Sequence, residues 1–491
     1  MKFLNFRGIN PQTKKNTIGI DITPLRPMEF YNVPCKLKNI AESVPVVKIG
    51  DEVKQGTLIA KPSGNFGVNI YSPISGKILN IIDKIDITGE FSKHILIMND
   101  NKDEVEDLHE LEAQNMVNLT MRLKECGMVD SLSGLPTYLK YAYTGSRAYT
   151  TLFILMDSTD PNNTVNQTLA EFKMEEVVNG AKYFMNITNA TTITFIFTEK
   201  NHRLAEKLKK HIAENKKNYD YKIKFIPNRY PFDNSYLLAF LVGKKKITGK
   251  MSFLDAGITI ENAESCYNFC RAVEFNKPVT SKIITIDGDN VIRKGNYSVR
   301  NGVSYSALLD FIGIEDKDCS AMFIDGNLMN GKALYDPDIS ITFFTNTIMY
   351  MKYDKVTAVR EYPCISCGKC AGVCPVLLNP QRIDRAYLSE DHDELVNLKI
   401  QSCIECGCCS YICPSKRFLT QRIAAAKFYD RNKKYESGKK KKGAKKWTNL
   451  SFQVHHSCTA TMMWIKCFCI LLCHWLSLQF SALHFLVCHL S

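Results

Sequence analysis

Tryptophan is the scarcest residue in this sequence of 491, and all three copies lie within the last 45 residues. The N-terminus, Met-Lys-Phe-Leu-Asn-Phe-Arg, has no long apolar run and no small-residue cleavage site, which argues against a signal peptide. Without one, the cysteine-rich part is expected to stay in a reducing cytoplasm, where thiols serve metals or redox chemistry instead of disulfides. The sequence also lacks a basic motif interleaved with aromatic residues, so we expect no nucleic-acid partner despite the net charge of +13.

Much of the positive charge lies in one run, residues 439–446, where six of eight residues are lysine. Such a run is read first as a solvated linker, next as a basic segment beside a membrane, and last as a nucleic-acid arm. Elsewhere, 45% hydrophobic and 23% charged residues are ordinary for a globular protein. The length is sufficient for three or more domains with buried cores.

Nine of the 19 cysteines fall between Cys364 and Cys413, in two copies of one spacing. Each copy reads Cys-x2-Cys-x2-Cys-x3-Cys-Pro, the arrangement of proteins with two [4Fe–4S] clusters, in which the fourth cysteine of each motif ligates the other cluster. The spacing therefore predicts a first-motif site and a second-motif site. The first-motif site comprises Cys364, Cys367, Cys370 and Cys413, and the second-motif site comprises Cys403, Cys406, Cys409 and Cys374.

Residues around these cysteines suit cluster binding. Gly368 and Gly407 provide permissive backbone between the ligands, and a proline follows each fourth cysteine. Cys408 is surplus and is not expected to be a ligand. Two zinc sites are the alternative, because Cys-x2-Cys is also a zinc spacing, but zinc does not require the full repeated motif. Helices predicted at 381–400 and 418–428 complete an α-helical domain at 355–432.

The first part of the chain is β-rich. Between residues 44 and 82, apolar alternation is interrupted by turns at 50–51 and 75–76, a pattern that resembles the barrel-sandwich hybrid of biotinyl and lipoyl carriers. The Met-Lys-Met hairpin of those carriers is absent, so the region 1–105 is expected to be a scaffold.

Strand-like and helix-like runs then alternate, which favours an α/β layer over 115–250. The predicted strands are 151–156, 191–197 and 222–226, and the predicted helices are 165–179 and 203–215. The segment 251–345 returns to short strands, the clearest at 281–287 and 338–344, around a helix at 304–312.

Together these features resemble the RnfC family, the C subunits of the Rnf complex, a membrane-bound ferredoxin:NAD oxidoreductase that moves ions. The resemblance covers about residues 5–430 and includes Phe-Arg-Gly-Ile-Asn-Pro at 6–11, Ser-Pro-Ile-Ser-Gly at 72–76 and Cys-Ile-Glu-Cys-Gly-Cys-Cys-Ser-Tyr-Ile-Cys-Pro-Ser-Lys at 403–416. It implies an α+β multidomain fold: a barrel-sandwich hybrid, an α/β domain similar to the flavin subunit of respiratory complex I, a β-grasp ligand-binding segment, and the two-cluster domain.

The resemblance also implies FMN and NADH as cofactors, and here this sequence departs from the family. The family's Gly-Gly-Ala-Gly-Phe-Pro-Thr loop is Ser-Leu-Ser-Gly-Leu-Pro-Thr at 131–137, and three further family segments have changed at 157–161, 230–235 and 325–331. Side chains at Leu132 and Ser133 oppose close approach of a phosphate to the backbone. The candidate FMN/NADH residues that remain are Gly134, Pro136, Thr137 and Lys140.

Residues 436–491 form a Lys-rich linker and an atypical tail. The stretch 467–490 is apolar but contains a glutamine and three histidines, which makes it a marginal membrane span. It is either a tail translated in a shifted frame or a genuine anchor. The expected location is the cytoplasmic face of the cell membrane, as a peripheral subunit.

Two functions are left open. In the first, the chain is an electron-transfer subunit of an Rnf-type oxidoreductase: its partners are the other Rnf subunits and NAD(H), a flavin splits hydride chemistry into single electrons, and the clusters carry them. In the second, the chain is a non-catalytic electron-transfer or adaptor subunit whose FMN/NADH site is lost. A relative of the A-type chain of NADH:quinone reductase shares the front of the sequence but lacks the eight cluster cysteines.

Overall fold

The computed structural model describes residues 7–11, 15–37, 40–64, 66–142, 147–215, 219–247, 251–317, 319–353 and 360–441. The proposed apolar tail lies outside these residues from position 442 onward, and residues 436–441 belong to the last helix, α14. No helix of this described part is long and apolar enough to cross a bilayer.

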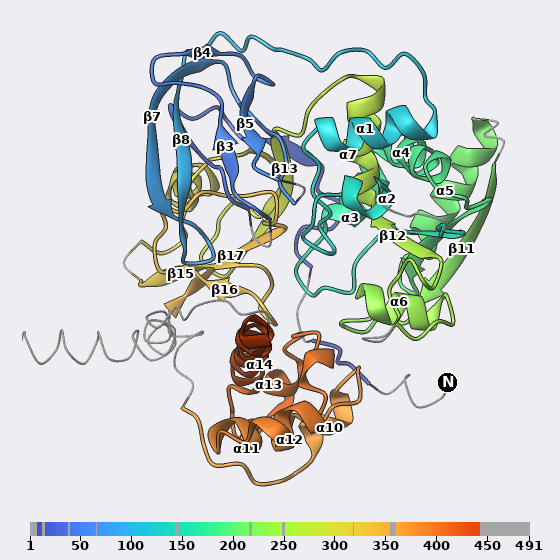
Figure 1. The fold of residues 1–491 in the computed structure, drawn as a ribbon, viewed down its shortest axis with the longest axis vertical. Helices are drawn as coiled ribbons and strands as arrows, with labels where there is room; N and C mark the ends of the chain where they lie inside the picture. The colour runs from blue at the N-terminus through green and yellow to red at the C-terminus, as the bar shows by residue number, and fades with distance from the viewer. Residues whose placement is uncertain are drawn as a thin grey trace, which may run out of the picture. The chain divides into compact units, whose positions relative to one another are not determined.

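Two small antiparallel sheets form the N-terminal region and enclose an apolar core, seen in blue in Figure 1. Residues Ile59, Ile74, Ile78, Ile95 and Ile97 are fully buried in that core. The predicted turn at 50–51 connects the short strand β4 to the preceding segment. One sheet has the order β2 (Phe30–Pro34), β8 (Phe91–Asn99), β7 (Gly76–Ile85), β4 (Glu52–Val53), and the other has β3 (Ser43–Pro45), β5 (Leu58–Pro62), β6 (Ile70–Tyr71).

His94, on β8, is only 1% exposed in this sheet. Burial, assisted by the charge of Lys84, lowers its pKa to about 4 from the usual 6.5. Because the unfolded strand takes up a proton at a higher pH than the folded one does, stability is lost as the pH falls from about 6.5 towards 4.

We expect the local unfolding free energy of β7 and β8 to fall by about 2 kcal/mol between pH 7 and pH 5. Hydrogen exchange of the β8 amides, corrected for intrinsic rates, measures this change. The variant His94→Gln carries no titrating group and should lose most of the pH dependence. An unchanged pH dependence in that variant would show that another group is responsible.

A parallel four-stranded sheet with the order β11-β10-β9-β12 forms the second region. Its side chains alternate between two cores: Leu152 and Ile154 of β9 enter the main core, whereas Phe153 and Leu155 pack in a second core with helix α6. The elements are β9 (Thr151–Leu155), β10 (Thr192–Thr198), β11 (Asp220–Ile226), β12 (Ile258–Asn262), and the helices α1 (Met116–Glu125), α2 (Tyr138–Ala142), α3 (Val165–Phe172), α4 (Met174–Asn186), α5 (His202–Glu214), α6 (Ser235–Leu241) and α7 (Ala263–Glu274).

The strands predicted at 151–156, 191–197 and 222–226 and the helix at 203–215 are confirmed as β9, β10, β11 and α5 within one or two residues. The single helix predicted at 165–179 is wrong. Lys173 leaves the helical region with φ −130° and ψ 39°, which separates α3 from α4.

The third region is a mixed six-stranded sheet with the order β1-β14-β13-β17-β15-β16 and one helix, α8 (Tyr305–Ile312). The strand predicted at 281–287 is confirmed, but the one at 338–344 is wrong. Ile339 and Ile341 are buried without a ladder, and among the described residues only an isolated bridge at Ser340 pairs this segment. The strands are β1 (Ile22–Pro24), β13 (Ser281–Asp287), β14 (Gly295–Arg300), β15 (Ala321–Asp325), β16 (Lys332–Ala333) and β17 (Thr347–Lys352).

The last region is helical, and its two halves repeat one another. Gly368 and Gly407 have φ of +71° and +81°, and each begins a five-residue helix that carries cysteines and packs against the other. The helix predicted at 381–400 is interrupted, because Ser389 ends α11 and Glu390 has φ +55°. The helices are α10 (Lys369–Val373), α11 (Pro380–Leu388), α12 (His392–Asn397), the 3-10 turn η2 (Ile400–Ser402), α13 (Cys408–Ile412) and α14 (Leu419–Lys441).

A buried carboxylate joins the two halves. Asp384 on α11 is 2% exposed and pairs with Arg417 at 2.6 Å and with Arg422 at 3.1 Å. Since both arginines follow the second motif, this pairing holds the exit of that motif against the helix that follows the first.

Candidate functional site

The cysteines of the first-motif site line one small cavity. Its wall contains the three closely spaced thiols of the first motif and, from the second motif, Cys413. The amide of Ser366 donates to the Sγ of Cys364 at 3.4 Å. Thiols around a cavity, together with a backbone N–H directed at sulfur, are the donor set that a cubane cluster requires.

The cysteines of the second-motif site also lie together, but they are more deeply buried. Burial raises the pKa of Cys403 to about 11 and that of Cys409 to about 12, and the charge of the nearby Cys374 contributes to both shifts. Backbone amides donate to sulfur here as well, from Glu405 to Cys403 at 3.4 Å and from Leu378 to Cys374 at 3.3 Å. Metal binding would replace the protons of these thiols.

No group of three or more His, Cys, Asp and Glu side chains in the described ranges is placed to hold a single metal ion. In a cubane each iron takes one protein thiolate, so the four thiols surround the cluster and do not meet at one point. The surplus Cys408 is fully buried and its Sγ lies 3.9 Å from the carbonyl oxygen of Tyr230, outside both ligand sets.

A pocket of about 260 Å³ opens at the carboxyl ends of the parallel strands β9 and β12. Seven asparagines line it, and none of the described residues in its wall is a lysine or an arginine. The N-termini of α3 and α7 contribute Val165, Asn166 and Glu264 to the wall. The lining residues are Ser131, Leu132, Leu155, Ser158, Asp160, Asn163, Val165, Asn166, Tyr230, Pro231, Asp233, Asn234, Ser235, Asn262, Glu264, Asn327, Asn330, Asn346, Ile404 and Cys406.

Each of the three carboxylates in the pocket wall is compensated. Glu264 forms a buried ion pair with Lys282 at 2.7 Å. Asp233 accepts from the amide of Thr159 at 3.1 Å, and Asp160 accepts from the amide of Asn163 at 3.0 Å. Burial raises the pKa of Asp160, which reduces the negative charge that it presents.

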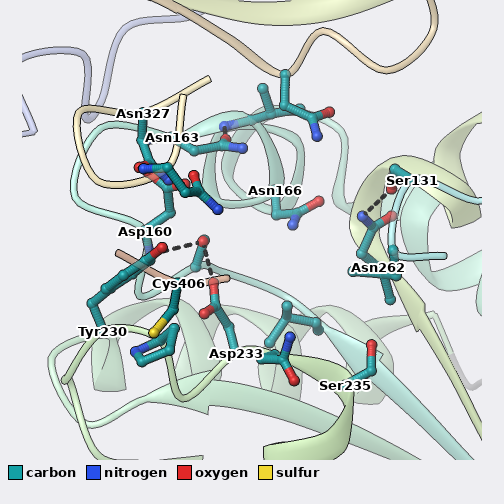
Figure 2. A pocket seen from close by; sticks show the side chains of 18 of the residues that line it. Ser131, Asp160, Asn163, Asn166, Tyr230, Asp233, Ser235, Asn262, Asn327 and Cys406 are labelled. Carbon is teal, nitrogen blue, oxygen red and sulfur yellow. Dashed lines mark hydrogen bonds between the residues drawn. The ribbon is translucent and has the colours of Figure 1, made fainter. Parts of the chain in front are cut away.

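All four sequence segments that depart from the family contribute to this pocket. They supply Ser131 and Leu132, Ser158 and Asp160, the stretch from Tyr230 to Ser235, and Asn327 with Asn330. Figure 2 shows Ser131 bonded to Asn262 on one side of the pocket and Tyr230 beside Cys406 on the other.

The four candidate FMN/NADH residues do not line the pocket. Gly134 and Pro136 are buried in the loop, with Gly134 at φ +73°, and Thr137 is fully buried. Lys140 is held between Asp130 at 2.7 Å and Glu261 at 2.9 Å. Burial alone would lower the pKa of Lys140, but the two carboxylates outweigh burial and raise it.

This ion-pair cluster supports the pocket from outside its lining. Asp130 also accepts from the amides of Leu132 and Ser133, both at 3.1 Å, and so fixes the loop that presents Ser131. Glu261 precedes Asn262, the residue that bonds Ser131 at 2.8 Å. Lys140 therefore joins the two segments that meet at the pocket wall.

The pocket wall includes two residues of the second motif, Ile404 and Cys406. Ile404 packs against the core of the α/β region, as does Leu132. Cys406 packs beside Tyr230 in a small cluster with Ile9 and Cys408. A ligand in this pocket would thus lie beside one of the predicted cluster thiols.

Family comparisons agree with this division of the chain. Residues 4–102 match the RnfC barrel sandwich hybrid domain, residues 124–271 the Nuo51 FMN-binding domain, and residues 358–414 a 4Fe-4S dicluster domain. The sequence is 30% identical over 393 residues to the C subunit of the proton-translocating ferredoxin:NAD(+) oxidoreductase complex of Clostridium ljungdahlii, covering 77% of this chain and 83% of that one. The chain belongs to the RnfC family.

A second RnfC relative, the C subunit of the Na(+)-translocating ferredoxin:NAD(+) oxidoreductase complex of Acetobacterium woodii, is 25% identical and covers 77% of this chain and 85% of its own. Among solved structures, NAD+-reducing [NiFe]-hydrogenase in the H2-reduced state matches at 13% identity with a TM-score of 0.48. That match covers 65% of this chain and 64% of the hydrogenase chain.

The RnfC chain is therefore a mixed α/β multidomain protein, as predicted, with a barrel-sandwich domain, a Nuo51-like domain and a 4Fe-4S domain. Sequence reasoning missed the pocket residues Asn166, Asn262 and Glu264. A signal for Asn262 was available, since an asparagine at the end of a buried strand and before a helix is both an N-cap and a residue at the ligand-binding edge of a parallel sheet.

Proposed function

We propose that this RnfC chain is the electron-transfer subunit of a membrane-bound Rnf-type complex, which couples electron flow between ferredoxin and NAD to ion translocation. The observation that carries the proposal is the presence of Cys406 in the wall of the FMN-type pocket. A two-electron cofactor site and a one-electron cluster site that share a wall are placed to exchange electrons.

The lining of the pocket fits a flavin mononucleotide. Amide and hydroxyl side chains can bond a ribityl chain, and the N-termini of α3 and α7 favour a phosphate where the described wall has no lysine or arginine. A flavin bound there would exchange two electrons with NAD(H) and single electrons with a cluster. Tyr230 and Ile404 fill the wall next to Cys406 and exclude water from it.

We assign the cluster ligands as the motif spacing predicts. The second-motif site (Cys403, Cys406, Cys409, Cys374) then lies at the pocket, and the first-motif site (Cys364, Cys367, Cys370, Cys413) lies at the surface. In support, Cys367 and the adjacent Ile365 are exposed, Ile365 to 67%. Electrons would pass between the pocket and a partner protein through both clusters in this order.

We also propose the domain limits 1–105, 115–250, 251–345 and 355–432, with a β-grasp fold for the third. A mixed sheet around one helix, α8, supports that fold. Gly134, Pro136, Thr137 and Lys140 would shape the pocket loop without lining the pocket. The other Rnf subunits would be the partners and hold the chain at the cytoplasmic face of the membrane.

NADH is expected to bleach the visible absorbance of the clusters in the full chain after anaerobic reconstitution with iron, sulfide and FMN. We expect about eight iron atoms per chain, as two [4Fe–4S] clusters require, and one flavin. Asn166→Leu, in the pocket wall, should lower flavin content and slow bleaching, whereas Asn189→Leu, at an exposed position, should change neither.

The adaptor function is the second candidate, and Leu132 favours it, since this side chain occupies the pocket wall where the family has glycine. It predicts clusters that dithionite reduces and NADH does not, in a protein without flavin. A stoichiometric yellow cofactor would eliminate the adaptor function, and its absence would eliminate the first proposal.

A further inference from the structure

Three segments that are distant in sequence meet at the second-motif site. The first is the N-terminal stretch, in which the amide of Gly8 donates to the carbonyl of Val373 at 2.8 Å. The second is the stretch at Tyr230, whose backbone exchanges two hydrogen bonds with Ile9 at 2.9 and 3.0 Å. Val373 directly precedes Cys374, so these bonds reach the predicted fourth ligand of the site.

The third segment is the loop 326–331 between β15 and β16, and it makes the closest approach. A Cβ atom on Gly407 would lie 1.9 Å from the carbonyl oxygen of Met329. Gly407 stands between Cys406 and Cys408, so only glycine permits this contact. The Met329 side chain packs on the small apolar cluster of Ile9, Tyr230 and Cys408, against which Cys406 also packs.

The same loop is fastened to the pocket. Its Asn327 donates to the carboxylate of Asp160, and the amide of Leu328 donates to Asn162 at 3.3 Å. Within the loop, the side chain of Asn327 accepts from the amides of Met329 at 2.7 Å and Asn330 at 3.0 Å. The loop is therefore held rigidly where it covers Cys406 and Cys408.

The first-motif site has a different environment. The loop 362–369, which carries Cys364 and Cys367, consists almost entirely of exposed residues. The described residues that line its cavity come from 364–419 alone. Water thus reaches the surroundings of one site, while at the other it meets a wall built from outside the cysteine motifs.

We propose that Met329, on the 326–331 loop, is a positioning residue that seals the second-motif cluster from water and thereby holds its reduction potential below the value that the cysteine motif alone would give. The inference rests on the proposed function, because it requires that the clusters bind. A reduced cluster carries more negative charge than an oxidised one, so admitting water stabilises the reduced form and raises the potential.

The test is a reductive titration of the full reconstituted chain, followed by electron paramagnetic resonance, in the wild type, Met329→Ala and Met329→Leu. We expect Met329→Ala to raise the midpoint potential of one cluster only, the one whose signal Cys406→Ser perturbs. Deuterium modulation of that signal after exchange into D2O should increase. Met329→Leu should restore both values, and Ile365→Ala, at the exposed first-motif loop, should leave them unchanged.

Three results separate the failures. Equal midpoints and equal deuterium modulation in the wild type and Met329→Ala would overturn the inference, and so would the same shift at both clusters. A wild-type chain that takes up no iron would overturn the proposed function itself.

Discussion

Cys413→Ala is expected to disrupt the same cluster as Cys364→Ala, although the two residues are 49 positions apart and belong to different motifs. The reason is that the thiol of Cys413 shares a cavity with Cys364, Cys367 and Cys370. Conversely, Cys374→Ala should match Cys403→Ala. The measurement is the paramagnetic resonance spectrum of the cluster that remains, together with an iron content that falls to about half.

Cys408→Ala is the matched control, since this cysteine lies inside the second motif but outside both ligand sets, and it should retain both clusters. If Cys413→Ala instead left the spectrum given by Cys403→Ala, each motif would hold its own cluster and the exchange of fourth ligands would be refuted.

Lys140→Met is expected to destabilise the α/β region by about 3–5 kcal/mol, the usual cost of removing one partner from a buried ion pair. Asp130 and Glu261 would remain buried at 1% and 0% exposure with no cation between them. Flavin binding should fall in parallel, because Asp130 fixes the loop that presents Ser131. Denaturant unfolding and flavin titration measure the two effects.

The double variant Lys140→Met, Glu261→Gln should recover part of the stability, because it removes one of the two stranded charges. Lys182→Met, at an exposed position of α4, is the control and should change little. A Lys140→Met protein of normal stability but without flavin would instead identify Lys140 as a direct phosphate ligand.

Local features of this fold could be predicted from the sequence. The strands β9, β10, β11 and β13 are apolar runs bounded by turns, and the cysteine motifs combine fixed spacing with glycines that require positive φ. Interruptions were less accessible: Lys173 and Glu390 depart from helical geometry without proline or glycine to mark them. Residues 338–344 are as apolar as a strand, but they pack into the core without a strand partner among the described residues.

The pocket was only partly predictable, because its walls come from five separated parts of the chain. The family resemblance identified four of those parts, including the loops at 131 and 327. It also singled out Lys140 as a candidate, but could not reveal that Asp130 and Glu261 enclose this lysine. Such a contact joins residues 121 positions apart, and no local pattern encodes it.

The contact between the beginning and the end of the chain has a consequence for biosynthesis. Arg7 donates to the carbonyl of Ala371 across 364 positions, and Gly8 to that of Val373. The first residues to leave the ribosome must therefore wait for almost the last domain to be made before they can be placed. Iron–sulfur assembly at the second motif would accordingly be among the latest events of maturation, and truncated translation products could not acquire a properly enclosed cluster there.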